Sequence, residues 1–193
     1  MNILNSLLEM TMRGGNFSSI AERYGKEHQA SWKTEGKHIG DIDNYQVKQY
    51  EHFYSLWDKD LLIGFNSLTK DKSDAPIVVD IVWINPDYQG KKLFSKMLWF
   101  YKTRLGHSKL MLGDIHSLAM QEVVKSGLSR FKKSWLKNET SEPFDIKTLD
   151  KYYDHSKSTG WQLVLENDGD FSNWPKFTDG KDYIKESYDW QIE

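Results

Sequence analysis

One stretch of the chain, residues 77–105, limits the available folds more than any other. Its first part, residues 77–84, is apolar on both alternating faces, as expected for a central strand that is covered on both sides. A proline-containing run at residues 85–88 then breaks the strand. Apolar side chains return at helical spacing over residues 93–105, and Gly106 ends that helix. The stretch therefore predicts a buried strand, a loop and a helix in direct succession.

The segments before this stretch predict helices and then a hairpin. Residues 1–12 have apolar side chains at helical spacing, and a second short helix is expected from Ser19, which has capping-box spacing to Glu22. Residues 25–44 are polar and mixed, which indicates a loop or the flank of an active site.

An aromatic-rich strand is expected at residues 45–57. After a turn at residues 58–60, residues 61–68 predict its hairpin partner. Gly64 in this partner is expected to mark a bulge or a close approach of another backbone.

The segments after the stretch predict further elements of both kinds. These are a short strand at 110–112, a helix at 118–124 that stops at Gly127, a polar segment at 129–147, helical turns at 149–153, a strand at 161–165 and a tail with scattered rings from Asn167. The order of helices and strands predicts an α/β or α+β sandwich, with helices packed on a mixed sheet.

Composition excludes several classes of protein. The 193 residues suit one domain. With 26 basic and 28 acidic residues the net charge is −2, whereas a dedicated nucleic-acid binder usually has a basic excess. The absence of cysteine excludes disulfides, thiolate metal sites and cysteine nucleophiles, and fits a cytoplasmic protein. No apolar run approaches the roughly 20 residues needed to cross a membrane, and no metal-binding or nucleotide-binding motif is present, so neither a membrane nor a metal is expected.

The junction between strand and helix is the main candidate site. Gly90 lets the backbone turn closely, and the first amides of the following helix have no partners within the helix. These amides form a positive site suited to phosphate, to which Lys91 and Lys92 add charge. The same residues also fit a polar loop that only connects two core elements, and spacing alone leaves both interpretations open.

Residues 80–98 resemble the core motif of GNAT-type (GCN5-related) N-acetyltransferases, in which a hydrophobic strand and a proline turn lead into a glycine-rich loop and a helix. The matching residues are Ile81, Ile84, Pro86, Tyr88, Gln89, Gly90, Lys91, Leu93 and Leu98. The order of elements over about residues 1–165 is also similar. The resemblance implies a mixed, mostly antiparallel central sheet flanked by helices. It implies one domain over residues 1–193, in which residues 129–193 complete the sheet and carry the aromatic tail.

The resemblance also implies a function, namely acyl transfer from acetyl-CoA as co-substrate to an amine on a small molecule or a protein. In that family the strand splays from its neighbour, and its free backbone groups pair with the pantetheine arm while the loop holds the pyrophosphate. On this chain the arm would meet Val82, Trp83 and Ile84. The pyrophosphate would meet Gln89, Gly90, Lys91, Lys92, Leu93 and Phe94. The chain departs from the pattern at Lys92, where a glycine is usual, and at Phe94, where glycine or alanine is usual.

Acyl transfer to an amine needs a base and an acid. Asp80 matches the strand carboxylate that serves as base in relatives, although a salt bridge or an edge position would equally explain it. The tyrosine that often serves as acid is replaced by Val123. His116 is the alternative proton donor, next to Asp114, unless it is structural. Tyr152 and Tyr153 are further candidates unless they simply pack.

Two other functions remain open at the level of sequence. The departures at Lys92, Phe94 and Val123 favour a degenerate member of this fold that binds or inhibits another protein. A nucleic-acid-directed protein would use a basic run with interleaved rings, unless that run is a solvated face. The run comprises Lys125, Arg130, Lys132, Lys133 and Lys137, with Phe131 and Trp135. Small cysteine-free chains with degenerate loops also resemble bacteriophage-encoded proteins.

Overall fold

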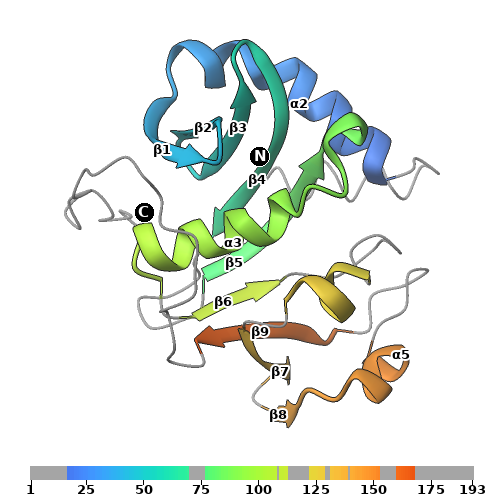
Figure 1. Ribbon diagram of the computed structural model, residues 1–193. Helices are drawn as coiled ribbons and strands as arrows, with labels where there is room; N and C mark the ends of the chain where they lie inside the picture. Colours follow the sequence, from blue (N-terminus) through green and yellow to red (C-terminus); the bar gives the residue numbers. More distant parts are fainter. Residues whose placement is uncertain are drawn as a thin grey trace.

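The computed structural model (Figure 1) describes residues 17–69, 77–107, 109–112, 122–128, 131–138, 140–152 and 160–167. Its strands are β1 (Lys37–Ile42), β2 (Tyr45–Tyr50), β3 (Phe53–Asp58), β4 (Leu61–Thr69), β5 (Ile77–Ile84), β6 (Lys109–Leu112), β7 (Phe131–Lys137), β8 (Thr140–Pro143) and β9 (Gln162–Asn167). Its helices are α2 (Phe17–Thr34), α3 (Leu93–Arg104) and α5 (Leu149–Tyr152), with single turns at η1 (Pro86–Tyr88), η2 (Val123–Gly127) and η3 (Ile146–Thr148).

The described strands form a single sheet in the order β1-β2-β3-β4-β5-β6-β9-β7-β8. β5 and β6 run parallel, while the other neighbouring strands run antiparallel. The chain from β5 to β6 crosses through α3, as a parallel pair requires. This confirms the expected α+β class with a mixed, mostly antiparallel sheet.

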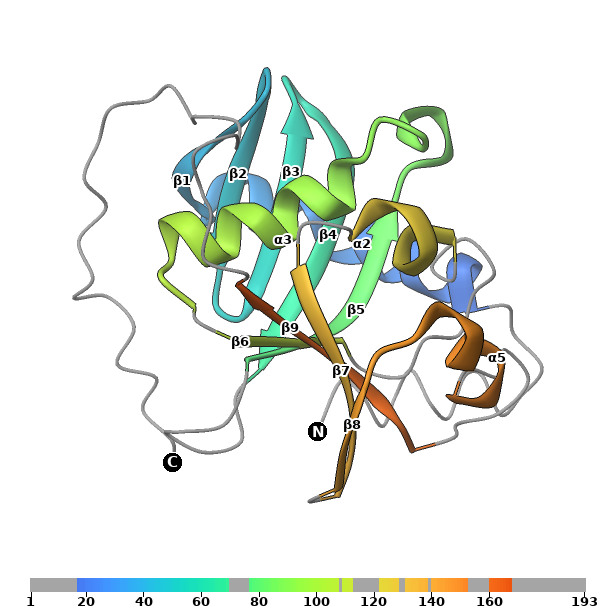
Figure 2. The ribbon, with the colours of Figure 1, turned by 60° about the horizontal axis from the view of Figure 1, so that its bottom comes forward.

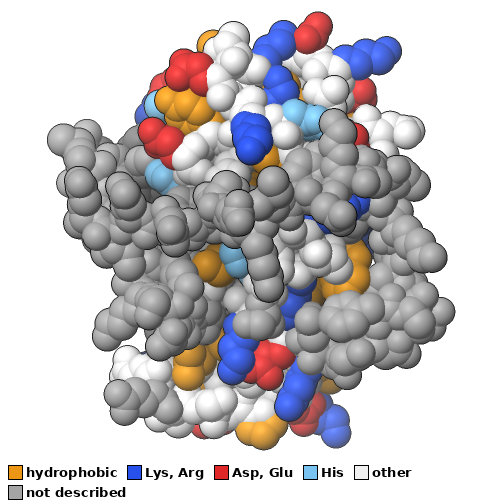
Figure 3. Space-filling model, turned by 90° about the vertical axis from the view of Figure 1, so that its left-hand side faces the viewer, with side chains coloured by type: hydrophobic (Ala, Val, Ile, Leu, Met, Phe, Trp, Pro, Cys, Tyr) orange, Lys and Arg blue, Asp and Glu red, His pale blue; other side chains and the backbone are white. Residues whose placement is uncertain are grey.

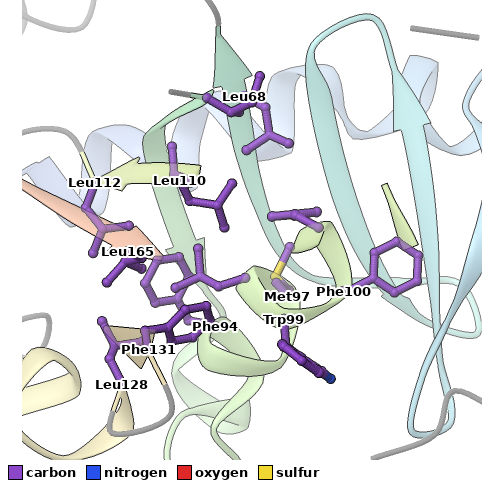
Figure 4. Close-up of a cluster of buried hydrophobic side chains, with 14 of the residues drawn as sticks. Leu68, Phe94, Met97, Trp99, Phe100, Leu110, Leu112, Leu128, Phe131 and Leu165 are labelled. Carbon is purple, nitrogen blue, oxygen red and sulfur yellow. The ribbon is translucent and has the colours of Figure 1, made fainter. Parts of the chain in front are cut away.

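Helices cover both faces of this sheet, with α3 on one face and α2 on the other (Figure 2). The α2-side core comprises Ile20, Ala21, Trp32, Phe53, Trp57, Leu62, Phe65, Ile81 and Trp83. The α3-side core is larger and includes Leu68, Ile77, Val79, Phe94, Met97, Phe100, Leu110, Leu112, Phe131 and Leu165, several of which appear in Figure 4. Because β5 contributes to both cores, it carries apolar side chains on both of its faces.

A bulge in β5 divides its side chains between these two cores. Along β4, Asn66 and Leu68 are two positions apart, but their partners on β5, Val82 and Val79, are three positions apart. The extra residue reverses the alternation of side chains. Residues 77 and 79 therefore face the α3-side core, whereas residues 81 and 83 face the α2-side core.

The prediction for Gly64 is confirmed in both of its forms. A register shift between β3 and β4 lies beside it, since Leu56 pairs with Gly64 and Trp57 with Leu62. A Cβ at Gly64 would lie 2.7 Å from Ile84 Cδ1. The glycine thus allows β4 to approach the end of β5, where the candidate site begins.

The predictions for three parts of the chain are wrong in the extent or kind of element. The short helix expected near Ser19 runs to Thr34, and the expected loop at 25–44 also contains β1. Only a narrow apolar stripe of α2 is buried, and it includes Gly25, whose absent side chain lets Phe65 approach. The strand expected at 45–57 is two strands, because Glu51 adopts a left-handed conformation (φ 52°) and makes a tight turn without glycine.

The third error is the segment at 129–147, which contains β7 and β8. Its lysines hide the alternation of buried Phe131 and Trp135. The strand at 77–84, the helix from Leu93, the strand at 110–112 and the strand after residue 161 are confirmed. The expected helix at 1–12 and the aromatic tail from residue 168 lie outside the described residues, as does most of the helix expected at 118–124.

Candidate functional site

The candidate site is a fork between β5 and β6. In the part of the chain that the structure describes, the two strands pair at Ile77, Val78 and Val79, the last of which lies opposite Leu112. β5 continues to Ile84, and Figure 1 shows the two strands starting side by side and then diverging. Within the described residues, the edge of β5 beyond Val79 has no strand partner on this side. Such an edge offers backbone donors and acceptors to an extended ligand.

Alternation along β5 decides which backbone groups face the open side of the fork. The amide of Ile81 points to Ser67 Oγ on β4 at 3.4 Å, and the amide of Asn85 donates to the Ile63 carbonyl at 2.9 Å. The backbone groups of the residues between them, Val82 and Ile84, therefore face the open side. Trp83 turns its backbone to β4 and its side chain into the α2-side core. Of the three residues expected to face a pantetheine arm, Val82 and Ile84 have their backbone groups on the open side and Trp83 does not.

The loop at the wide end of the fork turns through two left-handed residues, Gly90 (φ 80°) and Lys92 (φ 58°). Gly90 adopts this conformation at little cost, whereas a residue with a side chain loses roughly 1–2 kcal/mol. A glycine at position 92 would therefore relieve the backbone strain of the loop. Phe94, in contrast to Lys92, causes no strain in the loop. It lies in α3 with its ring buried in the core (Figure 4) and does not crowd the loop.

The first turn of α3 faces this loop with its amides available. Lys92 occupies the N-cap but makes no side-chain capping hydrogen bond, and the first helical bond runs from the amide of Lys96 to the carbonyl of Lys92. The amides of Leu93, Phe94 and Ser95 precede that bond and lack helical acceptors. Together with the helix dipole they create a local positive potential at the loop.

The two loop lysines have different surroundings. Lys91 lies on an aromatic pair, with its Nζ 4.2 Å from the Tyr88 ring centroid and 3.5 Å from the Tyr45 hydroxyl. The Tyr88 hydroxyl donates to Asp58 Oδ2 at 2.8 Å, and this bond raises the pKa of Tyr88. Lys91 and Tyr88 therefore tie the loop to β2 and β3, while Lys92 extends into solvent.

The side-chain amide of Gln89 binds the backbone at the end of β5. Its Nε2 donates to the Ile84 carbonyl at 3.2 Å, so the side chain folds back from the loop toward the open edge of β5. A ligand that pairs with Ile84 would displace or share this bond. Gln89 is exposed, so the exchange requires no repacking of the core.

Asp80 lies at the narrow end of the fork, directly after the last residue that pairs with β6. Its Oδ2 accepts a hydrogen bond from Thr69 Oγ1 at 2.6 Å, and its side chain is half-buried. The carboxylate is therefore held in a fixed position where the strands separate. This placement suits a group that acts at the tip of a ligand lying along β5.

Sequence reasoning missed His52, which the fold brings near Asp80. Burial lowers the pKa of His52, while the charges of Glu51 and Asp80 act in the opposite direction. Because residues 45–57 were expected to form one strand, no turn was predicted at this histidine. Its proximity to Asp80 depends on the pairing of β3, β4 and β5, for which the sequence gives no local signal.

Of the other positions considered for the acid, the two that the structure describes, Val123 and Tyr152, take part in packing. Val123 lies in η2 and packs against the α3-side core. The Tyr152 hydroxyl donates to Glu142 and accepts from Lys151, and its ring lies 4.5 Å from that of Trp161, so Tyr152 is a packing residue. His116, Asp114 and Tyr153 lie outside the described residues.

The described residues of the basic run do not form a continuous positive surface with exposed rings. Phe131 and Trp135 are buried, and Lys133 turns inward to donate to the Leu128 carbonyl at 3.0 Å. Burial lowers the pKa of Lys133. On the face shown in Figure 3, basic and acidic side chains are interspersed over the described part. The rings are therefore not available to stack on bases.

Two classes of site are absent from the described part of the chain. It holds no group of three or more histidine, cysteine, aspartate or glutamate side chains able to bind a metal ion. None of its helices is both long enough and apolar enough to cross a membrane.

Comparisons with known proteins give only low similarities. No protein-family model matches the sequence, and no curated protein matches it. A Bacillus subtilis acetyltransferase in complex with CoA is similar over 64% of this chain and 76% of its own, with 13% identity and a TM-score of 0.37. An IAA acetyltransferase from Bacillus cereus is similar over 64% and 77%, with 15% identity and a TM-score of 0.35. A mutant AtaT toxin bound to the C-terminus of the antitoxin AtaR is similar over 54% and 69%, with 13% identity and a TM-score of 0.29.

Proposed function

We propose that this protein is an acyl-CoA-dependent N-acyltransferase that transfers an acetyl group from acetyl-CoA to an amine acceptor. The observation that carries the proposal is the fork itself. An open strand edge, a loop with two left-handed residues and the uncapped start of α3 follow one another along the chain. An extended ligand with an anionic end fits this succession of groups.

The dimensions of β5 suit such a ligand. From Asp80 to Ile84 the strand rises by about 3.3 Å per residue, or roughly 13 Å in all. With the pyrophosphate at the loop beside Gly90, the pantetheine arm would pair with Val82 and Ile84. Its thioester would then lie at the narrow end of the fork, beside Asp80.

The chemistry required at that point is proton transfer. An ammonium acceptor must lose a proton before its nitrogen attacks the thioester carbonyl, and the thiolate that leaves must gain one. A carbon–nitrogen bond forms and the carbon–sulfur bond breaks. Asp80, fixed by Thr69, is placed to attract the ammonium.

The test compares two glycines with the same backbone conformation. Gly90 (φ 80°) and Gly106 (φ 70°) both have open space around an added Cβ, so alanine imposes similar strain at each. Only Gly90 belongs to the proposed pyrophosphate loop. We expect acetyl-CoA to bind the wild type and the Gly106→Ala variant equally, and the Gly90→Ala variant at least about 10-fold more weakly, which corresponds to about 1.4 kcal/mol.

Isothermal titration calorimetry with acetyl-CoA measures this difference, and a rise in melting temperature should accompany binding. Absence of binding to the wild type at millimolar acetyl-CoA would contradict the proposal. Equal weakening in both alanine variants would contradict the role of the loop.

A second function is supported by the strained backbone of Lys92 and the apolar packing of Val123. On this proposal the protein keeps the fold but binds or inhibits another protein without transferring an acyl group. Binding of acetyl-CoA without turnover of any amine, together with capture of a specific partner, would favour it. A nucleic-acid partner has weaker support because Phe131 and Trp135 are buried. Cytoplasmic location and a bacteriophage source stay predictions from the sequence.

A further inference from the structure

We propose that His52 accepts the proton that the acceptor ammonium loses, while Asp80 holds that ammonium beside it. The inference rests on the proposed N-acyltransferase function and assigns a proton acceptor from outside the strand that carries the fork. It also implies that the acceptor reaches the thioester from the face of the sheet covered by α2.

The register of three strands places His52 level with the start of the fork. His52 lies in the tight turn between β2 and β3, and its carbonyl accepts the amide of Leu68 at 2.9 Å. Leu68 pairs with Val79, the last residue of β5 that is joined to β6. Since neighbouring strands lie about 4.8 Å apart, the backbone of His52 is about two strand spacings from the start of the fork.

A side-chain hydrogen bond of Thr69 spans one of these two spacings, from β4 to β5. Thr69 follows Leu68 directly, and its hydroxyl donates to Asp80 Oδ2 at 2.6 Å. His52 therefore contacts Leu68 from the β3 side of β4, and Asp80 contacts the next residue, Thr69, from the β5 side. The charge of Asp80 reaches the imidazole, since it raises the pKa of His52.

The surroundings of His52 favour its neutral form. Its ring lies 4.3 Å from the ring of Phe53, which belongs to the α2-side core. Burial lowers the pKa of His52 and is the largest effect, while the charged groups that face it, Glu51 and Asp80, raise the pKa by less. The histidine is therefore mostly neutral at pH 7 and able to take a proton.

A division of roles between the two residues follows from their chemistry. An ordinary carboxylate has a pKa near 3.9 and is a weak acceptor for an ammonium proton, whereas an imidazole titrates close to the operating pH. In the proposed step the ammonium gives one proton to the imidazole nitrogen of His52. The neutral amine attacks the thioester carbon, the carbon–sulfur bond breaks, and the thiolate takes the second proton from the new amide nitrogen. The imidazolium then releases its proton to water.

The test replaces His52 by glutamine and uses His38→Gln as the matched control. His38 is exposed on β1, where its Nε2 lies 3.0 Å from Asp41 Oδ1. Acetyl-CoA consumption is followed with spermidine and with lysine methyl ester as acceptors. We expect His52→Gln to bind acetyl-CoA normally, to lower turnover about 100-fold at pH 7, and to remove the acid limb of the pH–rate profile. His38→Gln should retain the wild-type rate and profile.

A titration followed by NMR gives a result that needs no acceptor. The His52 ring should titrate below its ordinary pKa in the wild type, and still lower in Asp80→Asn, because the charge of Asp80 raises that pKa. The inference would be overturned if His52 titrated at its ordinary pKa, or if its pKa did not change in Asp80→Asn. It would also be overturned by an unchanged rate in His52→Gln, or by no turnover of either amine by a wild type that binds acetyl-CoA. Failure of the wild type to bind acetyl-CoA at all would overturn the proposed function together with this step.

Discussion

At the scale of single residues, the left-handed backbone of Lys92 has the clearest cost in conformational free energy within the candidate site. It holds a left-handed conformation directly before α3. Lys59, in the turn between β3 and β4, has nearly the same conformation (φ 54° against 58°) far along the chain from the loop. The pair separates the cost of strain from any effect on ligand binding.

We expect both Lys92→Gly and Lys59→Gly to change the free energy of unfolding only slightly, between about zero and 1 kcal/mol of stabilisation. Relief of roughly 1–2 kcal/mol of backbone strain is offset by the greater freedom of glycine in the unfolded chain. Only Lys92→Gly should change acetyl-CoA binding, because it alone alters the charge and the backbone strain of the proposed phosphate loop. Urea denaturation and calorimetry check the two quantities, and equal affinity in both variants would mean that Lys92 does not limit the loop.

The surroundings of His52 and Asp80 illustrate why single residues are hard to assign from sequence. Asp80 was a candidate because it interrupts an apolar strand. His52 carries no such mark, since a histidine among aromatic residues is as typical of a strand as of a site. The proposed role of His52 depends on a backbone hydrogen bond to Leu68, which no local sequence pattern predicts.

At the scale of elements, α2 is positioned by the absence of a side chain at Gly25. A Cβ there would lie 2.8 Å from Phe65 Cε1, which is in the fully buried ring of β4. Helix and sheet can therefore approach closely at this point.

We expect Gly25→Leu to destabilise the protein by about 1–3 kcal/mol, because the added side chain has to displace a packed aromatic ring. Ala30→Leu is the control, since Ala30 is exposed on the same helix and leucine has good helix propensity. Thermal and urea denaturation of both variants check the prediction. A stable Gly25→Leu protein would show that α2 does not pack as tightly as the geometry indicates.

At the scale of the whole molecule, the segment after residue 130 completes the sheet. β9 pairs with β6 and β7 pairs with β9, so residues far apart in the sequence extend the sheet beyond the fork. Trp135 anchors this part, with its ring 5.3 Å from Tyr152 and 5.6 Å from Phe144. The rings of the basic run therefore have a structural role in the fold.

We expect Trp135→Ala to reduce the free energy of unfolding by about 3–5 kcal/mol, as the loss of a buried tryptophan leaves a large cavity. Lys132→Ala, on the exposed face of the same strand, should change it by less than about 0.5 kcal/mol. Chemical denaturation measures both. The opposite pattern, with normal stability but weaker and less salt-dependent binding of single-stranded DNA in Trp135→Ala, would revive the nucleic-acid hypothesis.

The sequence by itself determined the succession of strand, loop and helix over residues 77–105, because periodicity, a proline turn and two glycines act over short distances. It also determined the α+β class and located Gly64 and Gly90. The bulge between Val79 and Val82, the separation of β5 from β6 and the approach of His52 to Asp80 were decided only by the tertiary structure. Each depends on which strands become neighbours and in which register, and pairing between distant segments leaves no periodic trace within any one of them.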